Sequence, residues 1–380
     1  MAQLSVGFVI VLASDCLSAD IAILTHMDWM FRIYGQGLTN CPIFPLDGSS
    51  AYCNQAGNSI ALPFFMAYLH LMSKIFIIGA TGYLGRHLVE ASVKLGHPTF
   101  ALVRPITASL NTEKINLIQS FRNNGVNILF GELNDHNWLV DVMKKVDIVI
   151  SALGHEPSTQ LEDQTRIISA IKEAGNIKRF LPSEFGYDVE RLQILEPAKS
   201  VLAIKVKIRE VIRKEGIPFT FVSSNFCCSY FLSRLGQVEA TGIPTETVFI
   251  LGDGNTKVIF VDEHDMATYA IKAADDERTL NKILYIRPSA NICSLNELVS
   301  LWEEKKRTTL ERIYVSEEEV LNKINETPEP WPFFYAISHA GFIKGETTNF
   351  DIDSSIGVEA SQLYTDVKYT TVEKYLNRFL

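Results

Sequence analysis

The sequence lacks the features that mark a metalloprotein, a disulfide-rich protein or a nucleic-acid binder. Its six cysteines in 380 residues form no Cys-x-x-Cys pair and no Cys/His spacing typical of a metal site, so no bound metal is expected. They are also too sparse for a disulfide framework, which favours a reducing compartment, and we expect the protein in the cytoplasm. Thirty-five Lys and Arg against 44 Asp and Glu give a net charge of −9, and this sign argues against nucleic acid as a partner.

Long apolar runs are missing as well. Two apolar stretches near the N-terminus, residues 6–13 and 60–72, are both shorter than the ~20 residues that a membrane helix requires. No Lys or Arg precedes the first stretch, which argues against a secretory signal, and Arg32 is the only Lys or Arg before Lys74. We therefore expect no membrane partner, and we interpret residues 1–72 as an N-terminal extension that is disordered or outside the fold. A targeting segment is the alternative.

From Ser73 onward, β-rich runs alternate with stretches of helical periodicity. Strands are expected at residues 74–78, 99–103, 126–130, 146–151, 179–181 and 219–223. Helices are expected between them at residues 83–95, 113–123, 136–144, 165–174 and 200–214. This alternation predicts βαβ units and an α/β fold with a doubly wound parallel sheet. After residue 225 the alternation loosens, and two charged helices at 294–306 and 316–324 indicate a smaller C-terminal α/β lobe.

A glycine-rich turn lies between the first expected strand and the first expected helix. Gly79, Gly82 and Gly85 occur there in the sequence GATGYLG. Gly79 permits a tight turn, Gly82 lets the backbone approach a pyrophosphate, and Gly85 allows close packing of the helix, whose N-terminal N–H groups are free to bind an anion. The pattern predicts a dinucleotide-binding Rossmann domain at residues 73–224. Residues 225–380 are then mainly a substrate-binding lobe, with some segments returning to the first domain.

The residue at the end of the second strand indicates which dinucleotide binds. An acid there would accept hydrogen bonds from the ribose 2′-OH, whereas Arg would pair with a 2′-phosphate. Arg104 occupies this position, which favours NADPH. Lys114, at the start of the next helix, is either a second cation for the same phosphate or a solvated surface lysine.

A proton donor is expected beside the nicotinamide. The usual Tyr-x-x-x-Lys pair has one match, Tyr364 to Lys368, but it lies far beyond the dinucleotide fold and is treated as chance. In the expected helix Lys205 is present, while Val201 takes the place of the tyrosine. A desolvated lysine near a cationic ring has a lowered pKa and suits general acid/base work, although a lysine on an exposed helix is more often only solvated. His339 is the second candidate.

With this glycine loop, Arg104 and Lys205, the sequence resembles the plant reductases of phenylpropanoids, a group of NmrA-like atypical short-chain dehydrogenases. Its members include phenylcoumaran benzylic ether reductase, isoflavone reductase, pinoresinol-lariciresinol reductase and eugenol synthase. The resemblance covers about residues 73–380 and is carried by GATGYLGRHLVEAS, GHPTFALVR, AIKEAGNIKRFLPSEFG, EPAKSVLAIKVKIR, GIPFTFVSSN, ILGDGNTKVIFVDE and VEASQLYTDVKYTTVEKYL. The loop GATGYLG, rather than one that begins Gly-Pro, argues against the isoflavone reductases proper, and the C-terminal half looks most like the phenylcoumaran benzylic ether reductases.

The resemblance implies a set of cofactor contacts. The residues that match the pyrophosphate loop are Thr81, Gly82, Tyr83 and Leu84, between Gly79 and Gly85. Those that match the 2′-phosphate site and a cofactor-proximal strand end are Arg104, Lys114, Ser183, Glu184 and Phe185. A further loop near the nicotinamide usually reads Asn-Cys-Phe in the family, whereas this chain has Asn225, Phe226 and Cys227. The exchange places the aromatic side chain of this loop one position earlier than in the family.

The resemblance also implies the chemistry. Lys205, in a Lys-x-x-x-Arg pattern with Arg209, matches the catalytic lysine, and Tyr230 and His339 match residues of the substrate cavity. Family chemistry implies that a hydride passes from NADPH to a benzylic carbon while a proton moves through the lysine and the phenol of a small phenolic substrate. A homodimer is left open.

Three activities therefore compete. The first is an NADPH-dependent reductase of the phenylcoumaran benzylic ether type. The second is an isoflavone reductase type or a eugenol or isoeugenol synthase type, the synthase using the same lysine but expelling an ester leaving group. The third, from another class, is a non-catalytic NADP sensor of the NmrA type, which would not need Lys205.

Overall fold

The computed structural model describes residues 72–105, 112–154 and 160–380. The predicted N-terminal extension, apart from Met72, lies outside the described residues. Within the described ranges, no helix is both long and apolar enough to cross a membrane.

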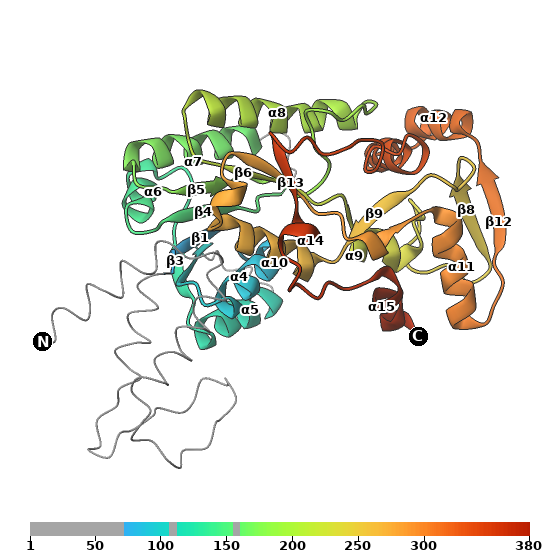
Figure 1. Cartoon of the computed structure of the whole chain (residues 1–380), viewed down its shortest axis with the longest axis horizontal. Coiled ribbons are helices and arrows are strands. Elements are labelled where there is room, and N and C mark those ends of the chain that lie inside the picture. Colours follow the sequence, from blue (N-terminus) through green and yellow to red (C-terminus); the bar gives the residue numbers. More distant parts are fainter. Residues whose placement is uncertain (1–71, 106–111, 155–159) are drawn as a thin grey trace, which may run out of the picture. The chain divides into compact units, whose positions relative to one another are not determined.

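The first half of the described chain forms a parallel sheet with the strand order β3-β2-β1-β4-β5 (Figure 1). Its strands are β1 (Ile75–Ile78), β2 (Thr99–Val103), β3 (Asn127–Phe130), β4 (Ile148–Ser151) and β5 (Arg179–Leu181). All four residues of β1 and of β4 are buried, as expected for strands covered by helices on both faces. These bounds agree with the predicted strands to within two residues at either end.

The sheet continues with strands from later in the chain. Phe180, in β5, bridges in parallel to Phe219, which precedes β6 (Thr220–Ser223). Strand β6 then pairs in parallel with β10 (Lys282–Tyr285), and β10 pairs with β13 (Gly357–Glu359). The sheet therefore contains strands from both sides of the predicted boundary at residue 224, and that boundary stays a prediction.

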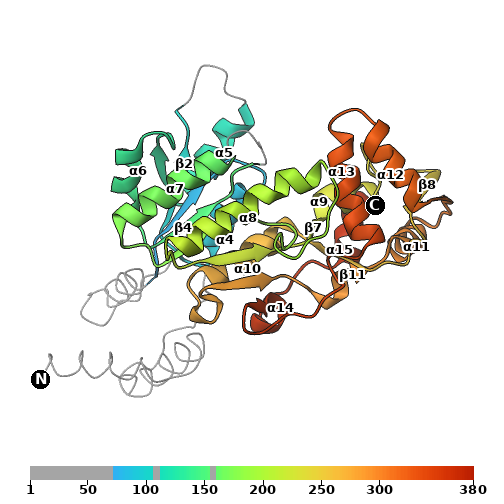
Figure 2. The same ribbon diagram turned by 90° about the horizontal axis from the view of Figure 1, so that it is seen from above.

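Helices cover both faces of the sheet (Figures 1 and 2). One face packs in a core with α4 (Gly85–Lys94), α5 (Thr112–Asn123) and α10 (Glu263–Ala274). The other packs with α6 (His136–Met143), α7 (Gln160–Ala174) and α8 (Ala198–Lys214). The predicted α/β fold with a doubly wound parallel sheet is confirmed.

A smaller lobe with its own apolar core completes the described chain. Its strands are β7 (Phe226–Cys227), β8 (Thr247–Leu251), β9 (Val258–Val261), β11 (Ile292–Cys293) and β12 (Glu311–Val315). Its helices are α9 (Cys228–Phe231), α11 (Leu295–Lys306), α12 (Glu317–Glu326), α13 (Trp331–Ser338) and α15 (Val372–Leu376), while α14 (Ala360–Leu363) follows β13. The two predicted charged helices are α11 and α12, and both begin with a capping box, at Ser294 and Ser316.

Candidate active site

The glycine loop joins β1 to α4 and has no room for side chains at two of its positions. Gly79 has φ +81°, and a Cβ there would lie 2.4 Å from the carbonyl oxygen of Ala152. A Cβ on Gly85 would lie 2.0 Å from the carbonyl oxygen of Gly79. Gly82 closes the turn by donating its N–H to that same oxygen at 2.9 Å. The loop is thus a tight backbone cradle, as predicted from its spacing.

The N-terminus of α4 has the electrostatics of an anion site. Its first turn reads Gly-Arg-His-Leu, without an acid, and no side chain of a described residue caps it. The N–H groups of Arg86 and His87 donate to the carbonyls of Gly82 and Leu84, while the positive end of the helix dipole favours a phosphate here. The residues present therefore fit the pyrophosphate of a dinucleotide.

Arg104 and Lys114 lie where a 2′-phosphate is expected. Strands β1 and β2 are parallel neighbours, with Ile77 opposite Ala101, so Gly79 and Arg104 leave the same edge of the sheet. Arg104 follows β2 directly and is exposed, and Lys114 is exposed in the first turn of α5. Their contacts with a phosphate stay predictions.

Lys205 is a buried lysine in the middle of α8. Its side chain is only 3% exposed, and Nζ donates to the backbone carbonyl of Glu184 at 2.6 Å. Burial lowers the pKa of Lys205 from 10.5 to about 8, against the opposing pull of the Glu184 carboxylate. An amine with this pKa exchanges a proton readily near neutral pH, which general acid/base catalysis requires.

Arg209 holds the Glu184 side chain in place. One helical turn after Lys205, its guanidinium is fully buried and donates from Nε to Glu184 Oε1 at 2.7 Å and from Nη1 to Asp188 Oδ1 at 2.7 Å. The phenol of Tyr285 donates to the other oxygen of Asp188 at 2.7 Å. This network fixes the segment that follows β5, so that the carbonyl of Glu184 faces Lys205. A third carboxylate, that of Glu190, accepts from Nη1 at 2.9 Å. The sequence indicated Arg209 only as the end of a motif, whereas its three acidic partners explain its burial.

The glycine loop is also tied to the smaller lobe. The phenol of Tyr83 donates to the carboxylate of Glu263 and hydrogen-bonds to Ser229. Ser229 donates both its N–H, at 3.0 Å, and its Oγ–H, at 2.8 Å, to Glu263. Partial desolvation of the phenol, together with the charge and hydrogen bond of Glu263, raises the pKa of Tyr83, so the phenol keeps its proton. Sequence reasoning missed Ser229 and Glu263. The signal for Glu263 is an acid two residues after the buried strand β9, where α10 begins.

Cys227 lies between these two groups of residues. Burial raises the pKa of its thiol to about 12, Glu263 adds to this effect, and the charge of Lys205 opposes it. The thiol is therefore protonated at pH 7 and is no nucleophile. Cys227 contributes to the electrostatics of both Tyr83 and Lys205, so the glycine loop, β7 and α8 lie within electrostatic range of one another here.

The exchange of Phe226 and Cys227 relative to the family pattern has a structural counterpart. Phe226 is 2% exposed and stacks on Phe231 with ring centroids 3.9 Å apart, inside the core of the smaller lobe. Gly341 leaves room for that ring, since a Cβ there would lie 2.3 Å from it. Asn225 has φ +59° and donates from Nδ2 to the carbonyl of Ile286 at 2.9 Å. Cofactor contacts by Asn225 and Phe226 stay predictions.

Ser183 and Phe185 flank Glu184 at the end of β5. Ser183 Oγ donates to the carbonyl of Leu153 at 2.7 Å, which links the ends of β5 and β4. Phe185 has φ +47° and donates its N–H to Val222 at 3.1 Å. Both lie at the carboxyl edge of the sheet, where ligands bind in open α/β folds.

The two predicted substrate residues lie in the smaller lobe. His339 is 4% exposed, and its Nε2 pairs with Glu317 at 2.8 Å. Tyr230 stacks on Phe334 with centroids 5.1 Å apart. Neither has a contact with Lys205 among the described residues, so their roles stay predictions. Tyr364 donates its phenol to Asp276 at 3.0 Å, and the assignment of its motif to chance stays a prediction.

Comparison with known proteins places the chain among plant reductases. Residues 72–376 match the NmrA-like family. The chain is 57% identical over 310 residues to a phenylcoumaran benzylic ether reductase of Populus trichocarpa, which covers 82% of this chain and 100% of that protein. It is equally 57% identical over 307 residues to a eugenol synthase of Petunia hybrida, covering 81% of this chain and 98% of the relative. The resemblance inferred from the sequence is confirmed.

A solved structure agrees in fold. The complex of leucoanthocyanidin reductase from Vitis vinifera with NADPH is 35% identical and superposes with a TM-score of 0.75, covering 80% of this chain and 99% of that one. The dinucleotide fold predicted from the glycine loop is thus shared with a protein that binds NADPH.

Proposed function

Because the chain belongs to the NmrA-like family, we propose that it is an NADPH-dependent reductase of phenolic phenylpropanoids with the activity of a phenylcoumaran benzylic ether reductase. The observation that carries the proposal is Lys205, a buried amine with a pKa of about 8. Its Nζ donates to the carbonyl of Glu184 at the carboxyl edge of the sheet and lies within electrostatic range of Cys227 in β7.

Different residues of the chain bind the cofactor and transfer the proton. NADPH, when bound, supplies the hydride for the benzylic carbon. The backbone cradle of residues 79–85 and Arg104 bind the phosphates. Nζ of Lys205 holds the proton that passes to or from the substrate phenol, and its hydrogen bond to the Glu184 carbonyl at 2.6 Å orients it. Since the pKa is close to the working pH, both protonation states are populated during turnover.

Two alternatives differ in a testable way. The 57% identity to the Petunia hybrida enzyme favours eugenol synthase as the second candidate, in which the same lysine would assist the loss of an ester group. A non-catalytic sensor is disfavoured by the burial of Lys205, because a binding role alone gives no reason to desolvate an amine.

A single assay separates these functions. The purified protein is given NADPH with a dehydrodiconiferyl alcohol or with coniferyl acetate, and NADPH oxidation and products are followed. We expect reduction of the first substrate. Turnover of the acetate alone would establish the eugenol synthase type, and oxidation with neither would favour the sensor.

The role of Lys205 is tested in the same assay. Lys205→Ala should abolish turnover and leave NADPH binding intact, while Lys207→Ala, an exposed lysine of the same helix, is the matched control. Near-normal turnover by Lys205→Ala would remove the lysine from the mechanism.

The remaining features are proposed on the same basis. We assign residues 73–224 to NADP binding and residues 225–380 mainly to substrate binding, and we place the protein in the cytoplasm, in keeping with its sparse cysteines. A chain that starts at Met72 should bind NADPH, and a failure to do so would make residues 1–71 part of the fold. Sedimentation of the full chain tests for a homodimer.

A further inference from the structure

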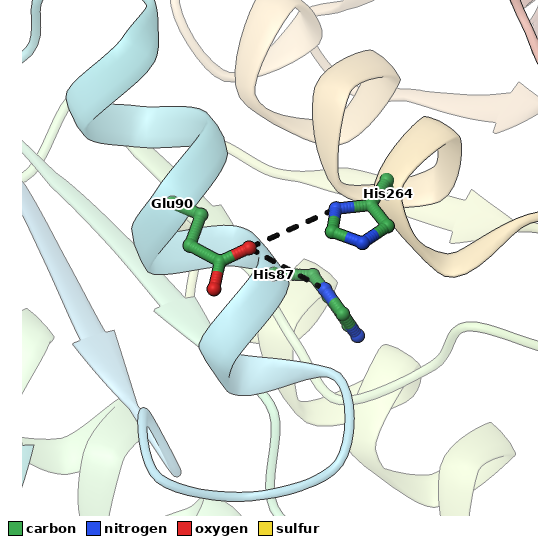
Figure 3. A group of neighbouring side chains, drawn as sticks. All are labelled: His87, Glu90 and His264. Atoms are coloured by element: carbon green, nitrogen blue, oxygen red, sulfur yellow. Dashed lines mark ion pairs between the residues drawn. The ribbon is translucent and has the colours of Figure 1, made fainter. Parts of the chain in front are cut away.

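A group of nitrogen and oxygen donors lies outside the catalytic site, where α4 meets α10. His87 and Glu90 are three residues apart on α4 and so share one face of that helix. His264 is the second residue of α10. Figure 3 shows the two imidazole rings and the carboxylate turned toward one another.

The distances are close to those of a metal site. Nδ1 of His87 and Nδ1 of His264 each lie 3.7 Å from the same oxygen, Oε2 of Glu90. The three candidate donor atoms are all within 4.8 Å of one another. Donors about 2.0–2.2 Å from a tetrahedral ion are roughly 3.3 Å apart, so small rotations of the side chains would complete the arrangement.

Two further observations point to a ligand. Nδ1 of His87 is buried and has no hydrogen-bond partner among the described residues. The two rings pack edge to face with centroids 4.2 Å apart, although both are polar groups that usually seek water or a partner. An ion bound at this nitrogen would satisfy it.

The backbone that carries the donors is rigid. Helices α4 and α10 pack in one core, which includes Leu88 and Ala91 of α4 and Ala267 and Ala270 of α10. Glu90 and His264 are 51% and 59% exposed, so an ion can enter from solvent and keep water in its open position.

We propose that His87, Glu90 and His264 form a binding site for a divalent transition metal of the Zn²⁺ class. Two imidazoles and one carboxylate suit Zn²⁺ and disfavour Mg²⁺ and Ca²⁺, which prefer oxygen ligands alone. The ion bridges α4 and α10. His264 follows Glu263, which holds Tyr83 of the glycine loop, so the metal also stiffens the start of α10 beside the cofactor loop.

The proposal is tested by metal binding to the full chain. Zn²⁺ is titrated into the metal-free protein in competition with a chromophoric chelator, for the wild type, His264→Ala, Glu90→Gln and His136→Ala. His136 is the matched control, since it pairs with Glu173 at 2.7 Å on the surface of α6 but belongs to no group of three candidate metal ligands among the described residues. Comparison with this control distinguishes the Zn²⁺ bound at the proposed site from Zn²⁺ bound elsewhere on the chain.

The expected outcome is the loss of one equivalent of Zn²⁺, or a weakening of more than about tenfold, in His264→Ala and Glu90→Gln but not in His136→Ala. Zn²⁺ at a hundredfold excess over its Kd should raise the Tm of the wild type by about 5 °C, and Mg²⁺ should not. Co²⁺ should give a visible absorption band that His264→Ala lacks. Equal Zn²⁺ binding and equal Tm shifts in all four proteins would overturn the proposal. Both mutated side chains are more than half exposed, so loss of folding is not expected, and circular dichroism of the metal-free proteins checks it.

Discussion

The burial of Lys205 predicts that this residue makes the folded protein less stable at neutral pH than it would be with an apolar side chain. A pKa that falls from 10.5 in the unfolded chain to about 8 in the fold means that the unfolded state binds more protons between these two values. Stability rises with pH wherever this holds. The cost of the buried charge is therefore fully present below pH 8 and is removed as the pH rises past 10.5.

The magnitude follows from the shift. Each pKa unit is worth about 1.4 kcal/mol, so the free energy of unfolding of the wild type should gain about 3 kcal/mol from this group across the interval. The free energy of unfolding of Lys205→Met lacks this pH-dependent contribution, because methionine does not titrate. It also leaves the Glu184 carbonyl without its donor, at a cost of about 1–3 kcal/mol that does not depend on pH. At pH 7 the free energy of unfolding of Lys205→Met should therefore equal that of the wild type or exceed it by up to about 2 kcal/mol. At pH 10.5 it should be lower than that of the wild type.

The assay is urea unfolding followed by circular dichroism at half-unit steps from pH 7 to pH 10.5. The quantity of interest is the difference in unfolding free energy between Lys205→Met and the wild type, in which the other titrating groups cancel. Lys207→Met, exposed on the same helix, should give a flat difference. A flat difference for Lys205→Met as well would refute the reasoning, because it would mean that the amine titrates alike in the folded and unfolded chains.

Three further substitutions test the rest of the site. Arg209→Met should lower the free energy of unfolding by about 3–5 kcal/mol, measured by urea unfolding, because it leaves two buried carboxylates unpaired; an unchanged stability would show that the network is not needed. Gly85→Ala places a Cβ against the carbonyl of Gly79 and should abolish NADPH binding in a fluorescence titration, whereas Gly154→Ala, with open space around its Cβ, should not. Equal binding by the two would contradict the cradle. Arg104→Asp should raise the Kd for NADPH by roughly a hundredfold, the loss of a charge-assisted contact, and leave that for NADH nearly unchanged. An equal rise in the Kd for both cofactors would refute the assignment of Arg104 to the 2′-phosphate.

The parts of the fold that depend on local pattern could be predicted from the sequence. The glycine spacing at residues 79–85 located the turn between β1 and α4. The alternation of strands and helices located the first six strands along the chain. Strand β13 could not be found in this way, because it has only three residues and, unlike the equally short β5, lies outside the regular alternation of strands and helices.

The candidate site was predictable only where a motif carries the residue. Lys205 stands in a recognisable helix, whereas Glu263 gains its role from a contact with Tyr83, 180 residues earlier in the chain. Such a contact follows from how the lobe packs and leaves no local signal. Phe226 shows the opposite case, since its place in the core is decided by Phe231 and Gly341 rather than by its position in the loop.

The late strands of the sheet have a consequence for biosynthesis. Strand β6 ends at Ser223, but its neighbour β10 begins only at Lys282, and the outermost strand β13 only at Gly357. At about 5–20 residues per second, a ribosome leaves the edge of β6 without its partner for several seconds. An unpaired edge in a nascent chain invites pairing with another chain, so this interval is when the protein most needs a chaperone. A premature stop anywhere between Ser223 and Lys282 would make that transient edge permanent, even though the whole glycine loop and Lys205 had already been synthesised.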